Sequence, residues 1–192
     1  MDPGPGNRST ILACALELFA SRGYEAVGVQ EIVDAAGITK PTLYHYFGSK
    51  RGLLDSLLEQ QFAALFHILT EAGTYERDLP QTVQRIARAY LAFATGHRAF
   101  YRLALAAWFA PPDGEAFRAV APYNERQQAL LEDLFVRAAS DHGNMRGRQR
   151  AYAATLLGMV NTYAGLVLNG YAEADDALVR QAVHQFLHGV FS

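Results

Sequence analysis

The chain has 192 residues, enough for one sizeable domain or two small ones, and its composition of 51% hydrophobic and 19% charged residues is typical of a globular protein. A formal net charge of −2 gives no overall basic signal for binding nucleic acid or an acidic membrane. The single cysteine, Cys14, excludes an internal disulfide and fits a reducing compartment.

No stretch has the pattern of a secretion signal or a membrane span. The longest uninterrupted apolar run, 103–110, is far shorter than the ~20 residues that cross a bilayer. Residues 1–8 are polar and rich in Pro and Gly, and we predict a flexible tail there. We therefore expect a soluble, cytoplasmic protein with no membrane partner.

Three short helices are predicted in the first fifty residues. The first covers 9–22, where apolar residues recur at the spacing of one helical face. The second, 29–36, ends at Gly37, a residue suited to the left-handed conformation that follows many helices. The third, 39–47, has Pro41 in its first turn, where a missing N–H costs nothing. A supporting helix followed by two helices joined through a Gly-containing turn predicts a helix-turn-helix.

The rest of the chain is also predicted to be helical, which gives an all-α fold of about nine helices. No stretch shows the alternation of a half-buried strand. Pro122 is expected to kink or divide one of the later helices. These predicted helices cover 50–70, 80–96, 98–110, 114–140, 147–170 and 176–191.

In the third predicted helix Leu43 and Phe47, four residues apart, face the core, so the remaining positions face water or a ligand. Three consecutive rings suit a DNA surface, because Tyr hydroxyls donate to phosphates and Thr groups contact base edges. Of the only two lysines of the chain, Lys40 lies at the front of this helix and Lys50 follows its end, and no acidic residue lies within 37–54. The side chains away from the apolar stripe are Thr39, Lys40, Thr42, Tyr44, His45 and Tyr46. Spacing alone leaves one alternative, a solvated helix hairpin with partly buried tyrosines.

Residues 11–54 resemble the DNA-binding domain of the TetR family, the bacterial repressors similar to the tetracycline repressor. The resemblance is carried by ILACALELFASRGY (11–24), EIVDAAGI (31–38) and TKPTLYHYFGSK (39–50), and LYHYF followed by Lys50 is its most specific part. It implies that the third helix contacts an operator and that Lys50 binds a phosphate. The residues at the operator-contacting positions are Lys40, Pro41, Thr42, Tyr44, His45 and Tyr46.

The start of the second helix departs from the family pattern. Members of the family often have Thr or Ser there, which binds a phosphate, whereas this chain has Gly28 and Val29. The resemblance then implies that this contact is lost or is made by a backbone N–H, with Gln30 as a partial substitute. The presence of Gly28 and Val29 here is expected to change the affinity for DNA and not the DNA-binding role itself.

By the same resemblance, residues 1–50 form the helix-turn-helix domain and 51–192 form a helical domain that binds an effector and dimerises. The family encloses its effector among the fourth through eighth helices, in a mostly apolar pocket with a few polar groups. Polar residues that interrupt apolar faces here favour a largely apolar effector with one or two hydrogen-bonding groups; a structural role is the alternative for each of them. The candidate ligand-binding residues are Phe66, Tyr101, Arg102, Leu105, Trp108, Phe109, Tyr123, Gln127 and Asn161.

The last two predicted helices carry small residues at helical spacing, among them Ala154 and Gly158. In the family these helices pair across a two-fold axis, which implies a homodimer through the last two helices. His184 and His188 are four residues apart but lack a third ligand, so we expect packing or a surface position rather than a metal site. Catalytic motifs are not recognisable, and we expect neither an enzyme nor a cofactor.

These observations predict a ligand-responsive transcriptional regulator. We expect a homodimer that binds double-stranded DNA at a palindromic operator and acts as a repressor, released by a small, largely apolar effector. Two other hypotheses stay open. A DNA-binding protein without a ligand would show no thermal shift with any small molecule, and a helical-bundle enzyme or carrier would show no salt-sensitive DNA binding.

Overall fold

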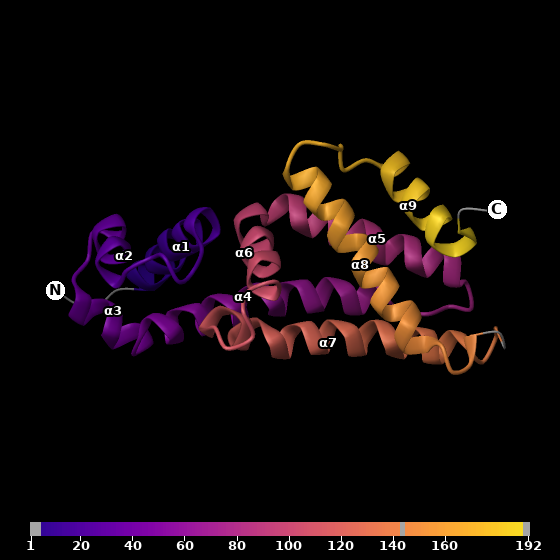
Figure 1. Cartoon of the computed structure of the whole chain (residues 1–192), viewed down its shortest axis with the longest axis horizontal. Helices are drawn as coiled ribbons and strands as arrows, with labels where there is room; N and C mark the ends of the chain where they lie inside the picture. Colours follow the sequence, from indigo (N-terminus) through magenta and orange to yellow (C-terminus); the bar gives the residue numbers. More distant parts are fainter. Residues whose placement is uncertain (1–4, 143–144, 190–192) are drawn as a thin grey trace. The chain divides into compact units, whose positions relative to one another are not determined.

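The computed structural model describes residues 5–142 and 145–189, and within these ranges the chain forms nine helices and no strand (Figure 1). This confirms the predicted all-α class. The helices are α1 (Pro5–Arg22), α2 (Val29–Ala36), α3 (Lys40–Phe47), α4 (Lys50–Ala72), α5 (Leu79–Gly96), α6 (Arg98–Trp108), α7 (Glu115–Ala138), α8 (Gln149–Leu168) and α9 (Asp176–His188).

Most predicted helix ends lie within two residues of the observed ones, and the larger differences concern α1, α7 and α9. α1 begins at Pro5, so residues 5–8 are helical rather than part of a tail, because proline is well suited to a first helical turn. The first four residues of the predicted tail lie outside the described residues. Pro122 lies inside α7, which is not divided there. α9 ends at His188, and the predicted extension to residue 191 passes beyond the described part of the chain.

The chain divides into two compact units, which do not follow the predicted domain boundary after residue 50. The first unit combines Met1–Phe62 with Ala99–Pro122, and the second combines Ala63–Arg98 with Tyr123–Ser192. Both α4 and α7 therefore contribute residues to each unit. The functional boundary after residue 50 stays a prediction.

The helix-turn-helix of the first unit is built on an apolar face of each short helix. Ile32 of α2 and Leu43 of α3 are completely buried, together with Ile11 of α1. Between α2 and α3 the chain turns at Gly37, whose φ of 64° lies in the left-handed region that favours glycine. At this turn the Ile38 N–H donates to the carbonyl of Val33 at 3.0 Å, which ends α2 and directs the chain into α3.

The core of the second unit lies between α5, α8 and α9, which pack against one another in Figure 1. The N-cap of α5 is Asp78, whose carboxylate accepts from the Gln81 N–H at 2.9 Å. Arg88 on α5 donates from two guanidinium nitrogens to Asp176 at the start of α9, at 2.9 and 2.8 Å. Arg98 donates to the carbonyl of Leu168 at the end of α8, at 3.0 Å. Hydrogen bonds thus hold the ends of α5, α8 and α9, whose central residues pack through apolar side chains.

One helix of the described chain, α8, is long and apolar enough to cross a membrane by length and composition alone. Seven of its residues are buried, and they pack toward α5 and α9. The core helix of a soluble protein meets the same criterion, so this property is weak evidence for a membrane segment.

Candidate DNA interface

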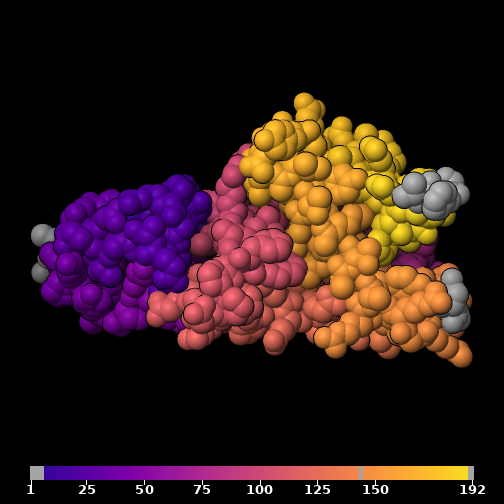
Figure 2. Space-filling model, viewed as in Figure 1, coloured from indigo at the N-terminus to yellow at the C-terminus, as the bar shows by residue number. Residues whose placement is uncertain are grey.

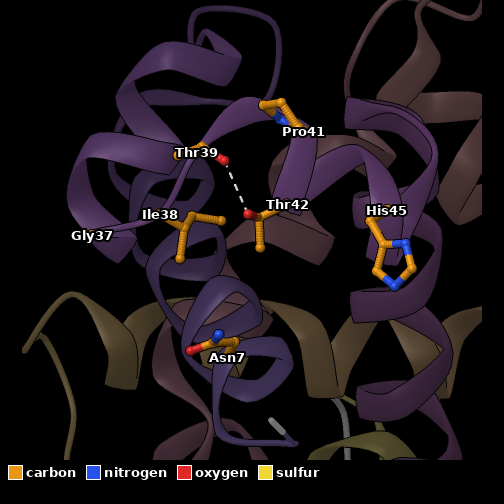
Figure 3. Close-up of a pocket in the computed structure, with 7 residues that line it drawn as sticks. All are labelled: Asn7, Gly37, Ile38, Thr39, Pro41, Thr42 and His45. Carbon is orange, nitrogen blue, oxygen red and sulfur yellow. Dashed lines mark hydrogen bonds between the residues drawn. The ribbon is translucent and has the colours of Figure 1, made fainter. Parts of the chain in front are cut away.

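An open groove of about 520 Å³ lies beside the N-terminal end of α3 (Figure 3). Asn7 of α1 lies on one side of it, and residues of the α2–α3 turn and of α3 form the other side. The residues that line the groove are Asn7, Gly37, Ile38, Thr39, Pro41, Thr42 and His45. Five of these seven belong to the stretch 38–45, so the groove follows the predicted recognition helix.

The start of α3 is arranged to meet an anion. Thr39 caps the helix in an extended conformation, and its hydroxyl lies 3.0 Å from the hydroxyl of Thr42 rather than bonding a backbone N–H (Figure 3). The first N–H groups of a helix have no acceptor within the helix, and its dipole makes that end favourable for negative charge. Lys40, the first residue of α3, is exposed and adds a positive charge at this end. A phosphate oxygen is the chemical group that this arrangement suits.

The predicted division of α3 into an inner and an outer face is confirmed. Leu43 and Phe47 are buried, as the sequence pattern required. Among the DNA-binding candidates, Thr39, Lys40, Pro41, Tyr44 and His45 are exposed, and Thr42, Tyr46 and Lys50 are half-buried. The structure therefore brings the α3 residues together on one accessible surface.

Lys50 has partners inside the protein that the sequence did not reveal. Its ammonium donates to the backbone carbonyls of Tyr24 and Val27, both at 3.0 Å. It also lies 4.1 Å from the centre of the Tyr24 ring, a cation–π distance. An ammonium has three donors, and these carbonyls take two of them. The role of Lys50 as a phosphate contact remains a prediction, now beside a structural role.

The start of α2 shows how the chain fills the position of the missing Thr or Ser. Gly28 is the N-cap, and its N–H donates to the Glu31 carboxylate at 2.9 Å. This bond, with an ion pair to Arg22, holds the pKa of Glu31 below its usual range. The side-chain amide of Gln30 donates to Asp34 at 2.7 Å. The Gly28 N–H and the Gln30 amide therefore already have acceptors within the protein.

Two residues of the groove region were missed because residues 1–8 were predicted to be a tail. Asn7 lines the groove, and the guanidinium of Arg8 lies 5.5 Å from the ring centre of Phe47 at the end of α3. The signal that could have found them is Pro5, which favours a helix start at this position. With α1 extended to Pro5, its first turns border the same surface as α3.

The candidate ligand-binding residues are divided between the two compact units. Tyr101, Arg102, Leu105, Trp108 and Phe109 belong to the first unit, and Phe66, Tyr123, Gln127 and Asn161 belong to the second. Phe66, Tyr101 and Gln127 are buried, Leu105, Trp108, Tyr123 and Asn161 are half-buried, and Arg102 and Phe109 are exposed. Phe109 is 83% exposed and stacks on Trp108, with ring centres 6.0 Å apart. Burial raises the pKa of Tyr101, which favours its neutral, hydrogen-bonding form.

Gln127 stands at the centre of a buried polar group in the second unit. It is only 5% exposed, and its side-chain oxygen accepts from the Tyr90 hydroxyl at 3.1 Å. Its nitrogen donates to Asn124 at 3.4 Å. Nearby on α7, the guanidinium of Arg126 lies 4.1 Å from the ring centre of Phe66. Tyr90, Asn124 and Arg126 were not among the predicted ligand residues, and their helical positions alone do not distinguish them from core or surface residues.

Among the residues that the structure describes, no group of three or more His, Cys, Asp or Glu side chains is placed to hold a metal ion. His184 and His188 lie side by side on α9, with ring centres 4.7 Å apart, and both are exposed.

Tyr44→Ala should weaken operator binding without destabilising the fold. The side chain is 45% exposed on the surface that carries the other α3 candidates. Removal of an exposed side chain of this kind typically changes stability by less than about 0.5 kcal/mol, whereas loss of a DNA contact costs roughly 1–3 kcal/mol. Fluorescence anisotropy with operator DNA and thermal denaturation measure the two effects. A large fall in melting temperature would instead make Tyr44 a structural residue.

The fold and this surface define the class of protein: a regulator that binds DNA through a helix-turn-helix. The family model described as bacterial regulatory proteins of the tetR family matches residues 11–57. The chain is 30% identical over 151 residues to the HTH-type transcriptional regulator YezE of Bacillus subtilis, covering 75% of each chain. The chain therefore belongs to the tetR family, and the predicted family resemblance is confirmed.

A second relative and two solved structures extend the similarity along the whole chain. The HTH-type transcriptional activator FasR of Mycolicibacterium smegmatis is 27% identical over 190 residues, which cover 99% of this chain and 85% of FasR. FadR from Bacillus subtilis in complex with stearoyl-CoA superposes with a TM-score of 0.79 at 17% identity, covering 95% and 98% of the two chains. AibR in complex with isovaleryl coenzyme A and operator DNA superposes with a TM-score of 0.70 at 22% identity, covering 96% of this chain and 100% of AibR. The similarity of fold therefore includes the helices that follow the matched DNA-binding segment.

Proposed function

We propose that this regulator binds a palindromic operator through the groove-lining surface of α3 and releases it when an acyl-CoA-like effector binds. The observation that carries the proposal is the single accessible surface formed by Thr39, Lys40, Pro41, Thr42, Tyr44, His45 and Tyr46 within the segment that matches the family. Lys40, the α3 N-terminus and the Tyr hydroxyls meet phosphates, while the Thr side chains reach base edges. Lys50 adds its third donor to a phosphate.

The effector is proposed to combine an apolar chain with a polar head. Its support comes from FadR and AibR, which were solved with stearoyl-CoA and isovaleryl coenzyme A. In this chain the buried polar group of Tyr90, Gln127 and Asn124 offers hydrogen bonds in surroundings that are otherwise apolar. Of the candidate residues in the same unit, Phe66 and Tyr123 contribute aromatic surface and Asn161 contributes an amide.

A homodimer through α8 and α9 is the proposed assembly. The outward face of α8 carries small exposed residues, including Ala151, Ala154 and Gly158, which permit close approach of a second helix. Figure 2 shows α8 and α9 at the surface of the second unit, where a partner chain has access. Two recognition helices about 34–36 Å apart then meet successive major grooves.

The protein is proposed to act in the cytoplasm as a DNA-binding regulator and not as a catalyst, which is the general habit of the family. We expect repression, by occupation of the operator, rather than the activation named for FasR. Effector coupling in such proteins is typically about 1–3 kcal/mol, enough to change affinity roughly 5–150-fold.

Fluorescence anisotropy with labelled DNA from upstream of the protein's own gene tests the proposal. We expect tight binding relative to a scrambled duplex, weakened as salt rises, and further weakened by stearoyl-CoA. Equal affinity for both duplexes would contradict an operator at this gene, and selection from random DNA would then show whether any sequence is preferred. A reporter fused to the same upstream DNA distinguishes repression from activation.

A further inference from the structure

Tyr24 joins three separate segments of the first unit. It lies in the turn between α1 and α2, is 2% exposed, and packs its ring edge against Phe19 with centres 5.1 Å apart. Its hydroxyl donates to the carboxylate of Glu115, the first residue of α7, at 2.7 Å. The ammonium of Lys50, the first residue of α4, lies 4.1 Å from the centre of the same ring and donates to the Tyr24 carbonyl. The turn that carries α2 and α3 is therefore attached to the starts of both α4 and α7.

The bond between Tyr24 and Glu115 has the chemistry of a strong contact. A hydroxyl that donates to a carboxylate is charge-assisted, and burial together with Glu115 raises the pKa of Tyr24, which keeps the proton on the donor. The loop just before Glu115 is compact, since a Cβ added at Gly114 would lie 3.1 Å from the carbonyl oxygen of Pro111. The Gly114 N–H donates to the carbonyl of Pro111 at 2.9 Å, which forms a turn immediately before Glu115.

Glu115 is also the start of a helix that continues into the second unit. α7 runs from Glu115 to Ala138, and the chain passes from the first unit to the second between Pro122 and Tyr123. Proline lacks the N–H that an α-helix interior normally uses, so the helical hydrogen bonding is interrupted at this crossing. Gln127, the centre of the buried polar group, lies on the same helix beyond it. α7 therefore connects Gln127 along the chain with Glu115, which is bonded to the α1–α2 turn through Tyr24.

We propose that Tyr24 and Glu115 are positioning residues that couple α7 to the recognition helix, so that their hydrogen bond transmits the effector response. This inference rests on the proposed function for its effector and on the proposed homodimer for the distance measurement below. With the bond intact, the position of the helix-turn-helix follows the start of α7. Without it, the α1–α2 turn retains Lys50 and Phe19 but loses its attachment to α7.

The mechanical part is tested without any effector, by the distance between the two helix-turn-helix units of a dimer. Ala35, exposed on α2, is replaced by Cys for a spin label, in a chain that also carries Cys14→Ser. Pulsed electron–electron double resonance then measures the label-to-label distance distribution in Tyr24→Phe, in Glu115→Ala and in the double variant. Tyr75→Phe is the matched control, because it removes a hydroxyl that donates to Asp141 at 2.9 Å in the second unit. Glu115 is exposed, so its alanine variant retains the fold even where Tyr24→Phe does not.

We expect the distance distribution to broaden equally in Tyr24→Phe, in Glu115→Ala and in the double variant, and to stay narrow in Tyr75→Phe. Equal effects in single and double variants indicate one shared interaction. Distributions as narrow as that of the unsubstituted chain in all variants would overturn the proposal.

The second readout is the ratio of operator affinities without and with stearoyl-CoA. We expect this ratio to fall about tenfold in Tyr24→Phe, the factor that corresponds to one hydrogen bond to a charged group, while Tyr75→Phe keeps the full response. A purely structural role would lower both affinities and leave the ratio unchanged, and that result would count against the proposal. If the unsubstituted chain does not respond to stearoyl-CoA, the proposed effector is wrong, and the distance measurement still decides the coupling.

Discussion

Gly52→Ala is expected to destabilise the first unit by roughly 2–3 kcal/mol, the cost of forcing extra volume into a packed position. A Cβ at this residue would lie 2.1 Å from the carbonyl oxygen of Phe47 and 3.3 Å from its carbonyl carbon. Those are backbone atoms at the end of α3, so they cannot move aside as a side chain does. The substitution therefore displaces the recognition helix relative to the start of α4. Urea denaturation measures the stability, and operator binding should fall with it.

Gly96→Ala is the matched control for this prediction. Gly96 ends α5, and a Cβ there would meet nothing within 4 Å. Alanine loses less conformational freedom than glycine in a helix, so this variant should be neutral or more stable, by up to about 1 kcal/mol. If the two variants had the same stability, the close approach of Gly52 to Phe47 would have no energetic consequence.

The course of the helices could be predicted because apolar residues repeat at helical spacing and because every break except His97, between α5 and α6, contains Gly, Pro or Asn. The inner face of α3 followed from the same spacing, since Leu43 and Phe47 are four residues apart and both are buried. The predicted start of α1 at residue 9 was wrong because the composition of residues 1–8 suggested a tail, while Pro5 is compatible with a first helical turn. Periodicity describes the faces of a helix well and its ends poorly.

Contacts between distant segments could not be predicted from spacing. Tyr24 and Glu115 are 91 residues apart, and nothing in the local pattern of either marks the other as its partner. The same holds for Gln127, which the sequence proposed as a ligand residue and which the structure joins to Tyr90, 37 residues away. Arg102 and Phe109 interrupt or extend an apolar run in the sequence, yet both are exposed. Helical phase fixes where a side chain points only after the packing of its helix is known.

The two lysines show the same limit within the DNA-binding segment. Lys40 is exposed at the start of α3, whereas the ammonium of Lys50 is held by two backbone carbonyls. The family pattern predicts DNA contact for both. The carbonyls of Tyr24 and Val27 come from an irregular turn, whose conformation no periodic pattern describes. A lysine that the family pattern assigns to DNA contact, such as Lys50, can therefore also stabilise the fold of the DNA-binding segment.

Replacement of each lysine by methionine, which keeps most of the side-chain length, separates the two roles. Lys50→Met should lower the free energy of unfolding by about 1–3 kcal/mol, because two carbonyl oxygens lose a charged donor and the Tyr24 ring loses its cation. Lys40→Met should leave stability within about 0.5 kcal/mol of the original, as for most exposed positions. Urea denaturation of both variants in the absence of DNA gives this comparison directly.

The dependence of operator binding on salt then reports the phosphate contacts. Each variant should lower the slope of log K against log salt by roughly one unit, as expected when one phosphate contact is lost. For Lys50 this requires its third N–H to reach the DNA while the other two remain on the carbonyls. An unchanged slope in Lys50→Met, together with reduced stability, would restrict this lysine to its structural role. Unchanged stability with a reduced slope would show that the carbonyl bonds add little and that the ammonium serves the phosphate.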